Sequence, residues 1–340
     1  MEEVGREMKK SATVLAVENL KKYYAPGAGL ASFFSRSGSR FVKAVDGISF
    51  SVGRGEIFAL VGESGSGKTT TGQLCVRAVE PTSGSIMFND MDLAKIKSSD
   101  LRKLRRKLQM IYQDPFDAID PRFTVFDVVA EGVQAHSLAN SRQELEEMVT
   151  NMLGKVGLAP DEMMHRFPHQ LSGGQRQRVA FARAAILEPE FVVADEPVSM
   201  LDVSIKAEVL NTMLRLRDDL GISFLFITHD LSWARHVSDR IAVMYLGKIV
   251  EIADADELVK NPLHPYTQAL IAATPIPDPR EGRPKVVAKG EIPSAIDVPP
   301  GCSFHPRCPY AFERCNSDIP KLLESSSEHF VSCHLVNSSD

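Results

Sequence analysis

The stretch Gly62-Glu-Ser-Gly-Ser-Gly-Lys-Thr69 decides how the rest of this chain is interpreted. It fits G-x-x-x-x-G-K-[ST], the pattern of a phosphate-binding P-loop. The apolar residues at 56–61 predict a buried strand before it, and 68–79 predict a helix after it. In that setting the glycines let successive backbone N–H groups point inward, and the helix N-terminus adds partial positive charge. The stretch therefore predicts a nucleotide site rather than a plain glycine-rich turn.

The residues of this loop have separate expected roles. Lys68 is expected to reach the β- and γ-phosphates of the nucleotide, and the hydroxyl of Thr69 to bind Mg²⁺. The other residues expected to cradle the phosphates are Gly62, Ser64, Gly65, Gly67 and Thr70.

The composition is that of a globular protein. The 340 residues suffice for one large or two modest domains, with 24% charged and 44% hydrophobic residues. A net charge of −5 gives no overall attraction to nucleic acid, so no nucleic-acid partner is expected. A basic cluster at 102–107 is expected to be the solvated face of a helix.

The distribution of apolar residues predicts a cytosolic chain. No run of 18 apolar residues appears, and the N-terminus lacks an apolar signal core. The five cysteines are therefore expected to be free thiols or metal ligands rather than disulfides.

Strands alternate with helices through the middle of the chain, which predicts an α/β fold with a parallel sheet covered on both faces. Residues 25–40 are expected to form a loop insertion. The expected strands are 15–20, 42–52, 56–61, 85–88, 108–112, 191–194, 222–228 and a hairpin of 238–246 with 247–252 that turns at Gly247. The expected helices beyond the P-loop are 98–107, 126–158 with a break at Asn140-Ser141, 175–187 and 204–220.

The amino-acid composition of the chain changes after Thr274. Nine of the 20 prolines lie between Pro275 and Pro309, so this segment is expected to be extended and irregular. Four of the five cysteines follow in the last 39 residues. A domain boundary is therefore expected near residue 273.

Two further sets of residues carry chemistry. Asp195 and Glu196 follow the apolar residues 191–194, which places both carboxylates at the end of a central strand, where ligands bind in open α/β sheets. Asp195 is suited to hold Mg²⁺ through water, and Glu196 to deprotonate an attacking water. Leu171-Ser-Gly-Gly-Gln175 precedes a strong helix and predicts either a second anion-binding helix N-terminus or a simple N-cap.

Taken together, these motifs resemble the ordered motif set of an ABC-type ATPase. The residues that carry the resemblance are 62–69, Gln113, 171–175, 191–196, 199–202 and His229. The resemblance implies an ABC-type P-loop ATPase domain over 12–273, with a parallel-sheet core, an antiparallel β subdomain and an α-helical subdomain at about 114–175.

The resemblance also implies roles for single residues. Gln113 is expected to contact Mg²⁺ together with Thr69 and Asp195, and His229 to bond the γ-phosphate. Tyr24 is expected to stack on adenine, with Tyr23 as the alternative. Two subunits are expected to pack head to tail. Each would close Ser172, Gly173, Gly174 and Gln175 on ATP held by the partner's P-loop.

The C-terminal part narrows the resemblance to the oligopeptide/dipeptide transporter ATPases. Residues 261–270 and 301–309 are similar to that subfamily, as are 202–205 and 246–251, while Met200 stands where the family usually has Ala. The implied function is ATP hydrolysis that energises peptide import. Nickel or an oligosaccharide is the alternative solute. The implied partners are a second, related ATPase subunit, two transmembrane permeases and an extracytoplasmic substrate-binding protein, and the implied location is the cytoplasmic face of the cell membrane.

Two other classes compete with a transport ATPase. DNA-repair ABC ATPases often carry a long coiled-coil insertion between the P-loop and the signature motif. Here Lys68 and Ser172 are 104 positions apart, without sustained heptads. A P-loop kinase would not need residues 171–175. Both alternatives therefore fit the chain less well.

Residues 274–340 contain a four-cysteine motif formed by Cys302, Cys308, Cys315 and Cys333. Their spacing is wider than the C-x₂-C repeat of a zinc ribbon, so either a metal or buried thiols are possible from the residues alone. The subfamily resemblance favours a [4Fe–4S] cluster over Zn²⁺. His305 and His334 are close enough to replace a thiolate but are expected to be exposed. Cys75 is expected to be an ordinary packed thiol.

Overall fold

The structure is a computed structural model that describes residues 13–25, 41–114, 120–273, 288–291 and 293–337. Residues 26–40 of the predicted loop at 25–40, and residues 274–287 of the proline-rich segment, lie outside the described residues. By its contacts the chain divides into two compact units. The first comprises Met1–Ala16, Ser51–Ile57 and Met87–Ile227, and the second comprises Val17–Phe50, Phe58–Ile86 and Thr228–Asp340.

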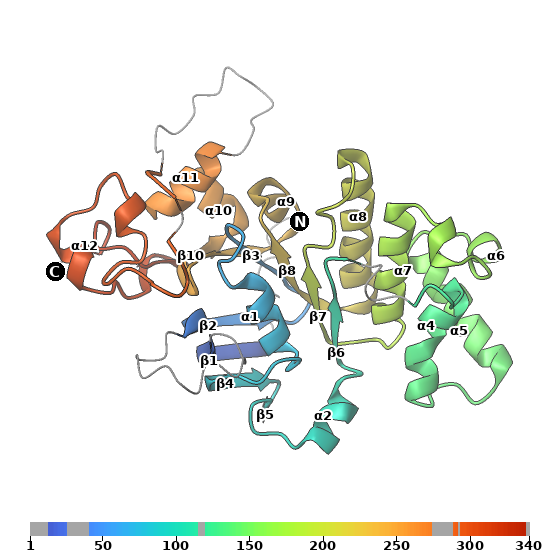
Figure 1. The fold of residues 1–340 in the computed structure, drawn as a ribbon. Coiled ribbons are helices and arrows are strands. Elements are labelled where there is room, and N and C mark those ends of the chain that lie inside the picture. The colour runs from blue at the N-terminus through green and yellow to red at the C-terminus, as the bar shows by residue number, and fades with distance from the viewer. Residues whose placement is uncertain (1–12, 26–40, 115–119, 274–287, 292, 338–340) are drawn as a thin grey trace, which may run out of the picture. The chain divides into compact units, whose positions relative to one another are not determined.

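The sheet of the first unit is built from three parallel strands (Figure 1), namely β6 (Leu108–Ile111), β7 (Phe191–Asp195) and β8 (Ser223–Thr228). Every residue of β7 and β8 is buried, which explains why both strands read as continuous apolar runs. The predicted strands at 108–112, 191–194 and 222–228 are therefore confirmed.

Helices make up most of the rest of the first unit. The helix α4 (Val125–Ala135) packs against α5 (Arg142–Lys155) and α7 (Gly173–Ala185), and α7 also packs against α8 (Val203–Leu220). The predicted break between α4 and α5 is confirmed, because the Ser141 side chain accepts the backbone N–H of Glu144 and caps α5. The short α6 (Pro160–Met163) and η3 (Pro168–Gln170) complete the predicted helical segment among its described residues.

The strand β5 (Met91–Asp92) and the helix α2 (Ser98–Leu104) lie between β4 and β6 in the chain. The helix ends three residues before the predicted end at Lys107. The charged residues Arg102, Lys103, Arg105, Arg106 and Lys107 are all exposed, as the solvated-face interpretation predicted.

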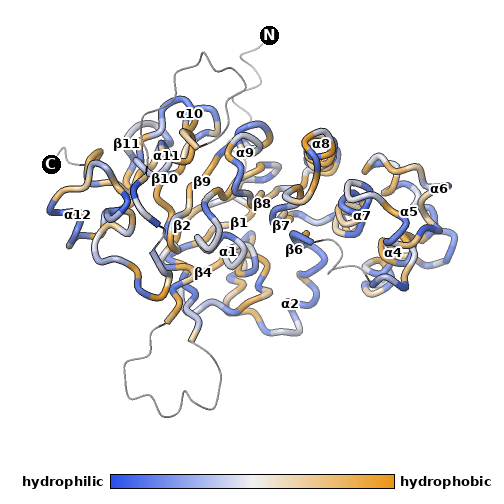
Figure 2. Tube along the Cα trace, turned by 45° about the horizontal axis from the view of Figure 1, so that its top comes forward, coloured by the Kyte–Doolittle hydropathy of each residue, from blue (hydrophilic) through white to orange (hydrophobic). Residues whose placement is uncertain are grey.

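The second unit contains a group of strands from the four-stranded sheet and a pair of parallel strands. Its strands β1 (Thr13–Tyr24), β2 (Val42–Gly53) and β4 (Ser83–Phe88) lie in the order β2-β1-β4. The strand β3 (Ile57–Val61) pairs in parallel with β9 (Arg240–Tyr245). The apolar character of β9 is visible in Figure 2.

The hairpin of β9 and β10 (Lys248–Asp254) turns where the sequence predicted. Leu246 and Gly247 both have positive φ, at 43° and 78°, as a two-residue hairpin turn requires. The helix α1 (Lys68–Cys75) is shorter than the predicted 68–79, since Arg77 takes a φ of 48° and ends the helical path. The helices α9 (Leu231–Val237), α10 (Ala255–Lys260) and α11 (Pro265–Ala273) complete this part of the unit.

The C-terminal region is less irregular than predicted. It contains η4 (His305–Arg307) and α12 (Glu313–Ser317), and then β11 (Leu323–Ser326) and β12 (His329–Val331). The strand β12 pairs antiparallel with β10, and β11 pairs with β12. One reason is a buried polar contact between β12 and β10, where Nε2 of His329 lies 2.8 Å from Oε1 of Glu251. Among the described residues no helix combines the length and apolarity needed to cross a membrane.

Candidate nucleotide-binding site

The P-loop has a backbone that only glycine can supply. Gly65 and Gly67 have φ values of 77° and 104°, in the left-handed region. A Cβ atom at Gly62 would lie 2.2 Å from the carbonyl oxygen of Met244, and one at Gly67 would lie 2.0 Å from that of Ala44. The loop is therefore packed closely against neighbouring backbone on one side. Ser64, Gly65 and Thr69 remain exposed.

Lys68 is held across this loop. Its side chain is buried, and Nζ donates to the carbonyl oxygens of Gly62 at 2.7 Å and Glu63 at 2.9 Å. A fixed ammonium group beside exposed loop residues is suited to attract phosphate oxygens. The following residue, Thr69, is exposed and lies in the first turn of α1.

Two contacts that sequence reasoning missed fix the loop in place. The backbone N–H of Glu63 donates to Oη of Tyr266 at 2.9 Å, and the backbone N–H of Gly247 donates to the carbonyl oxygen of Ser66 at 2.9 Å. Tyr266 lies in the stretch 261–270 that carried the subfamily resemblance. That stretch indicated the subfamily, but no pattern in it indicated the contact of Tyr266 with the P-loop.

The two tyrosines that were candidates for adenine stacking differ in their surroundings. The hydroxyl of Tyr23 donates to Oδ1 of Asp46, and burial, aided by that carboxylate, raises the pKa of Tyr23 to about 12. Tyr24 is 37% exposed, and its ring has the Nζ of Lys22 at 5.0 Å from the centroid. Base stacking requires an accessible ring, and Tyr24 is the more exposed of the two residues.

His229 is an exposed residue directly after β8. The next residue, Asp230, caps α9, because its Oδ1 accepts the backbone N–H groups of Ser232 at 2.9 Å and Trp233 at 3.4 Å. The backbone on the C-terminal side of His229 is thereby fixed, while its imidazole remains accessible.

The two carboxylates of the first unit have different environments. Asp195 is the last residue of β7 and is 2% exposed, whereas Glu196 is half-buried with a φ of 45°. A non-glycine residue in this region is strained and needs outside support. Its backbone N–H donates to the carbonyl oxygen of Ile227 at 2.9 Å, and its carbonyl oxygen accepts the Ser199 hydroxyl at 3.1 Å.

The Glu196 side chain has a hydrogen-bond partner in Gln113, which the sequence predicted only as a contact of Mg²⁺. Nε2 of Gln113 donates to Oε2 of Glu196 at 3.2 Å, and Gln113 is exposed at the end of β6. The structure therefore brings Gln113 and Glu196 together in the first unit. Ser199, which holds the strained backbone, was quoted in the sequence only as part of the motif 199–202 and not as a supporting residue.

The residues 172–175 form a capped helix start. The hydroxyl of Ser172 accepts the backbone N–H of Gln175 at 3.3 Å, and Oε1 of Gln175 accepts the backbone N–H of Ser172 at 2.9 Å. A Cβ atom at Gly174 would lie 2.4 Å from Cγ2 of Ile205, so this glycine permits close packing of α7 on α8. Ser172 and Gly173 are exposed, which leaves this helix start open to an anion from outside the chain.

The four C-terminal cysteines line one small cavity of about 20 Å³, together with His264, Phe304 and Phe312 among others. All of them are free thiols, and burial raises the pKa of Cys302 to about 11. Burial also raises the pKa of Cys308 and Cys333. Within the described ranges, no group of three or more His, Cys, Asp or Glu side chains is arranged to hold a metal ion.

The histidines near this cavity are more enclosed than predicted. His334 is 7% exposed, so its predicted exposure is wrong, and its Nε2 lies 2.8 Å from the carbonyl oxygen of Asp318. His305 is half-buried, with Nδ1 2.9 Å from the carbonyl oxygen of Cys302. Cys75 is fully buried, as predicted, and burial raises its pKa to about 12.

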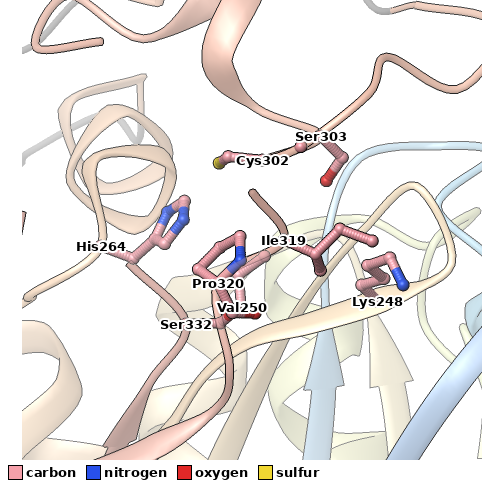
Figure 3. A pocket seen from close by; sticks show the side chains of 9 residues that line it. Lys248, Val250, His264, Cys302, Ser303, Ile319, Pro320 and Ser332 are labelled. Carbon is pink, nitrogen blue, oxygen red and sulfur yellow. The ribbon is translucent and has the colours of Figure 1, made fainter. Parts of the chain in front are cut away.

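His264 is a histidine that sequence reasoning did not single out. It is 1% exposed, and its Nδ1 accepts the backbone N–H of Tyr266 at 3.0 Å. Burial lowers its pKa to about 4, although the nearby Glu251 acts in the opposite direction. Figure 3 shows its ring on the same side of a second small cavity as the sulfur of Cys302. His264 is therefore uncharged at neutral pH and lines the cavity of the four cysteines.

A P-loop after a parallel strand, a carboxylate pair at the end of another strand and a serine-capped glycine helix start together define the class of ABC-type ATPases. The model of the ABC transporter family matches residues 45–199, and the model of the oligopeptide/dipeptide transporter C-terminal region matches residues 250–315.

Similar proteins agree with that class. The oligopeptide transport ATP-binding protein AppF of Bacillus subtilis is 46% identical over 96% of this chain and 98% of its own length. A protein of Sinorhizobium fredii named as a probable peptide ABC transporter ATP-binding protein is 44% identical over 96% of this chain and 90% of its own length. The chain therefore belongs to the ABC transporter family, in the branch of oligopeptide and dipeptide transport ATP-binding subunits, and it is an ABC-type ATPase.

Solved structures show the same fold. A dimeric ATP-binding cassette in a post-hydrolysis state, bound to ADP and Pi, is 25% identical with a TM-score of 0.62, covering 71% of this chain and 98% of that chain. A component of an ABC transporter complex from Clostridium perfringens is 27% identical with a TM-score of 0.63, covering 73% of this chain and 91% of that chain. The predicted α/β ABC ATPase fold is therefore confirmed.

Proposed function

We propose that this chain is the ATP-hydrolysing subunit that energises the import of di- or oligopeptides through a membrane ABC transporter. The observation that carries the proposal is the presence, in one chain, of the P-loop geometry and of the oligopeptide/dipeptide-type region at 250–315. Relatives named for oligopeptide or peptide transport match along nearly the whole chain, and their names support the substrate class.

The P-loop residues bind and orient the nucleotide in this proposal. The N–H groups of Ser64, Gly65 and Gly67 and the ammonium of Lys68 would hold the phosphates, because backbone donors at a helix start favour anions. Tyr24 would stack on the base. Thr69, Gln113 and Asp195 would hold Mg²⁺, which neutralises phosphate charge as the bond to the leaving oxygen breaks. Hydroxyl, amide and carboxylate oxygens are the donor set that this ion prefers.

Glu196 and His229 act on the transferred phosphoryl group. Glu196 would accept a proton from a water as that water's oxygen bonds to the γ-phosphorus and the bond to the β,γ-bridging oxygen breaks. The Gln113 amide and the strained backbone of Glu196 orient this carboxylate. The His229 imidazole would bond the γ-phosphate.

The exposed helix start at Ser172 supports assembly with a second ATPase subunit. Ser172, Gly173, Gly174 and Gln175 of each chain would close on ATP held by the other chain's P-loop. We propose a related chain as that second subunit, on the cytoplasmic face of the cell membrane. Two transmembrane permeases and an extracytoplasmic substrate-binding protein would complete the importer.

The solute is tested by measuring the ATPase rate of the reconstituted complex with candidate substrates. A di- or oligopeptide together with the binding protein is expected to raise the rate, while nickel and an oligosaccharide leave it unchanged. Stimulation by nickel or an oligosaccharide alone would replace peptide as the substrate class and keep the ATPase assignment. A rate that no solute or permease changes would instead favour a non-transport ABC ATPase.

We further propose that the C-terminal region at 274–340 is a separate functional part, distinct from the ATPase domain at 12–273, and that its four thiols bind a [4Fe–4S] cluster, with Zn²⁺ as the alternative. All four line one cavity, which fits a shared ligand. Buried thiols with raised pKa values release their protons when they bind a metal.

Anaerobic purification with iron, sulfide and zinc analysis tests this cofactor. Brown protein that loses its colour on Cys308→Ser would support the cluster, with Cys75→Ser as the matched control that keeps the colour. Colourless protein with one equivalent of zinc would replace the cluster by zinc. Protein with neither metal would leave a folded region with buried free thiols.

A further inference from the structure

The P-loop of the second unit is bound to the C-terminal region through Glu63. Its two carboxylate oxygens accept a forked pair of hydrogen bonds from Arg307, Nη1 to Oε2 at 2.8 Å and Nη2 to Oε1 at 3.3 Å. Its backbone N–H donates to Oη of Tyr266. Both the side chain and the backbone of Glu63 are therefore held by residues that lie more than 200 positions later in the chain. The carboxylate and the guanidinium are separated by 244 positions in the chain.

Arg307 is held rigidly. Its side chain is 10% exposed, and the guanidinium carbon lies 5.9 Å from the ring centroid of Tyr245 and 6.0 Å from that of Phe304. Those two rings meet edge to face at 5.3 Å, and both are buried. A forked ion pair within an aromatic enclosure is stronger and more directional than a pair on an open surface.

The position of Arg307 depends on the cysteine region. It lies in η4, between Cys302 and Cys308, where the backbone N–H of His305 donates to the carbonyl oxygen of Cys302 at 2.9 Å. The backbone N–H of Cys308 donates in turn to the carbonyl oxygen of His305 at 3.2 Å. Phe304 both contacts the guanidinium and lines the cavity of the four thiols. A change in the geometry of this short loop would therefore move the guanidinium.

The ion pair also has an electrostatic consequence for the nucleotide site. The Glu63 carboxylate belongs to a loop that binds a polyanion, and an unneutralised negative charge there would repel phosphate. Arg307 neutralises this charge, and Arg307 and Tyr266 together hold Glu63, whose carbonyl oxygen accepts from Lys68.

We propose that Arg307 is a positioning residue for the P-loop and that it couples nucleotide affinity to the state of the four-cysteine region. The coupling is reciprocal, so bound nucleotide also stabilises the loop between Cys302 and Cys308. This inference rests on ATP binding at the P-loop and is independent of the transported solute and of which metal, if any, the thiols bind.

Nucleotide affinity in a double-mutant cycle tests the charge argument. Arg307→Met is expected to weaken ATP binding by about tenfold, since contacting charged partners couple at this scale. Adding Glu63→Gln to it removes the unneutralised charge and is expected to restore affinity to within about threefold of wild type. Arg314→Met, which removes an exposed pair with Asp318 at 3.4 Å in the same region, is the control expected to bind ATP normally. Wild-type affinity in Arg307→Met, or a double variant no better than the single one, would overturn the inference while leaving ATP binding by the wild type intact.

Hydrogen–deuterium exchange tests the reciprocal effect and does not depend on the stability of the Arg307 variant. ADP is expected to slow amide exchange over residues 302–308 in the wild-type chain, and Glu63→Gln is expected to abolish that slowing while the chain still binds ADP. Unchanged exchange in the wild type on binding ADP, or slowing that persists in Glu63→Gln, would contradict the coupling.

Discussion

Lys68 supplies a positive charge at the point where the loop backbone is most constrained. Its Nζ donates to two carbonyl oxygens of the loop itself, so the ammonium is already in place before phosphate arrives. Replacement by alanine, Lys68→Ala, is expected to weaken ATP binding by at least about tenfold, because charge-assisted bonds to phosphate are lost. Isothermal titration with ATP measures this. The exposed Lys97→Ala serves as a control, and equal affinities for wild type and Lys68→Ala would contradict the role.

Removal of the Glu196 carboxylate is expected to slow ATP hydrolysis without preventing ATP binding. Glu196→Gln keeps the shape of the side chain and loses the base, so ATP should still bind while the hydrolysis rate falls by about 100-fold or more. Phosphate release at saturating ATP measures the rate, in parallel with a binding titration. Glu147→Gln, on the exposed surface of α5, is the matched control expected to keep the wild-type rate. Hydrolysis by Glu196→Gln at that same rate would show that another group is the base.

The site residues that were predicted from the sequence belong to short local patterns, whereas those that were missed make contacts between distant parts of the chain. Gly65, Gly67 and Lys68 belong to one eight-residue pattern, and their geometry agrees with it. Tyr266 contacts the P-loop across 203 positions and Arg307 across 244, and no local pattern encodes such a pairing. The sequence therefore predicted the phosphate-binding residues of the loop but not the distant residues that fix the loop in position.

At the scale of elements, four segments of the first unit meet at Glu190, the residue that precedes β7. Its carboxylate accepts hydrogen bonds from Nη1 of Arg54 at 3.0 Å, Nζ of Lys107 at 2.6 Å and Nδ2 of Asn89 at 3.2 Å. Burial opposes ionisation, but these hydrogen bonds prevail and lower the pKa of Glu190 to about 2.

This network predicts a pH dependence of stability. Because the folded-state pKa is lowered, the contribution is fully present above the ordinary pKa of 4.5 and is lost as the pH falls through about 2. Glu190→Gln is expected to unfold at a lower temperature than wild type at pH 6, and this gap is expected to narrow between pH 4.5 and pH 2. Thermal unfolding followed by circular dichroism measures the gap, with the exposed Glu162→Gln as control. A gap that stays constant over that range would contradict the network's role.

Some helix and strand boundaries could be predicted from the neighbouring residues alone, and others could not. The start of α5 was predictable because Ser141 supplies a cap within the same few residues. The strands β11 and β12 were not predictable. The residues of β11 are all exposed, and the contact that accompanies the pairing of β12 with β10 joins His329 to Glu251 across 78 positions. Tertiary contacts therefore decided this part of the sheet.

At the scale of the whole molecule, each chain carries a P-loop and an exposed capped helix start of the kind that binds an anion. Under the proposed assembly these two surfaces serve different ATP molecules. The isolated chain is therefore expected to be largely monomeric with low ATPase activity, rising when the second ATPase chain and the permeases are added. Light scattering and phosphate release over a concentration series measure both properties. Full activity from a strict monomer, independent of concentration, is the outcome that would contradict the assembly.

The most direct test of the central claim, that ATP hydrolysis by this chain drives peptide import, is uptake of a labelled oligopeptide by proteoliposomes that contain the complete transporter. The account predicts uptake with ATP at the side of the ATPase subunits, no uptake with ADP, and uptake reduced to near background when this chain carries Glu196→Gln. Peptide uptake at the wild-type rate with ADP, or with the Glu196→Gln chain, would contradict it.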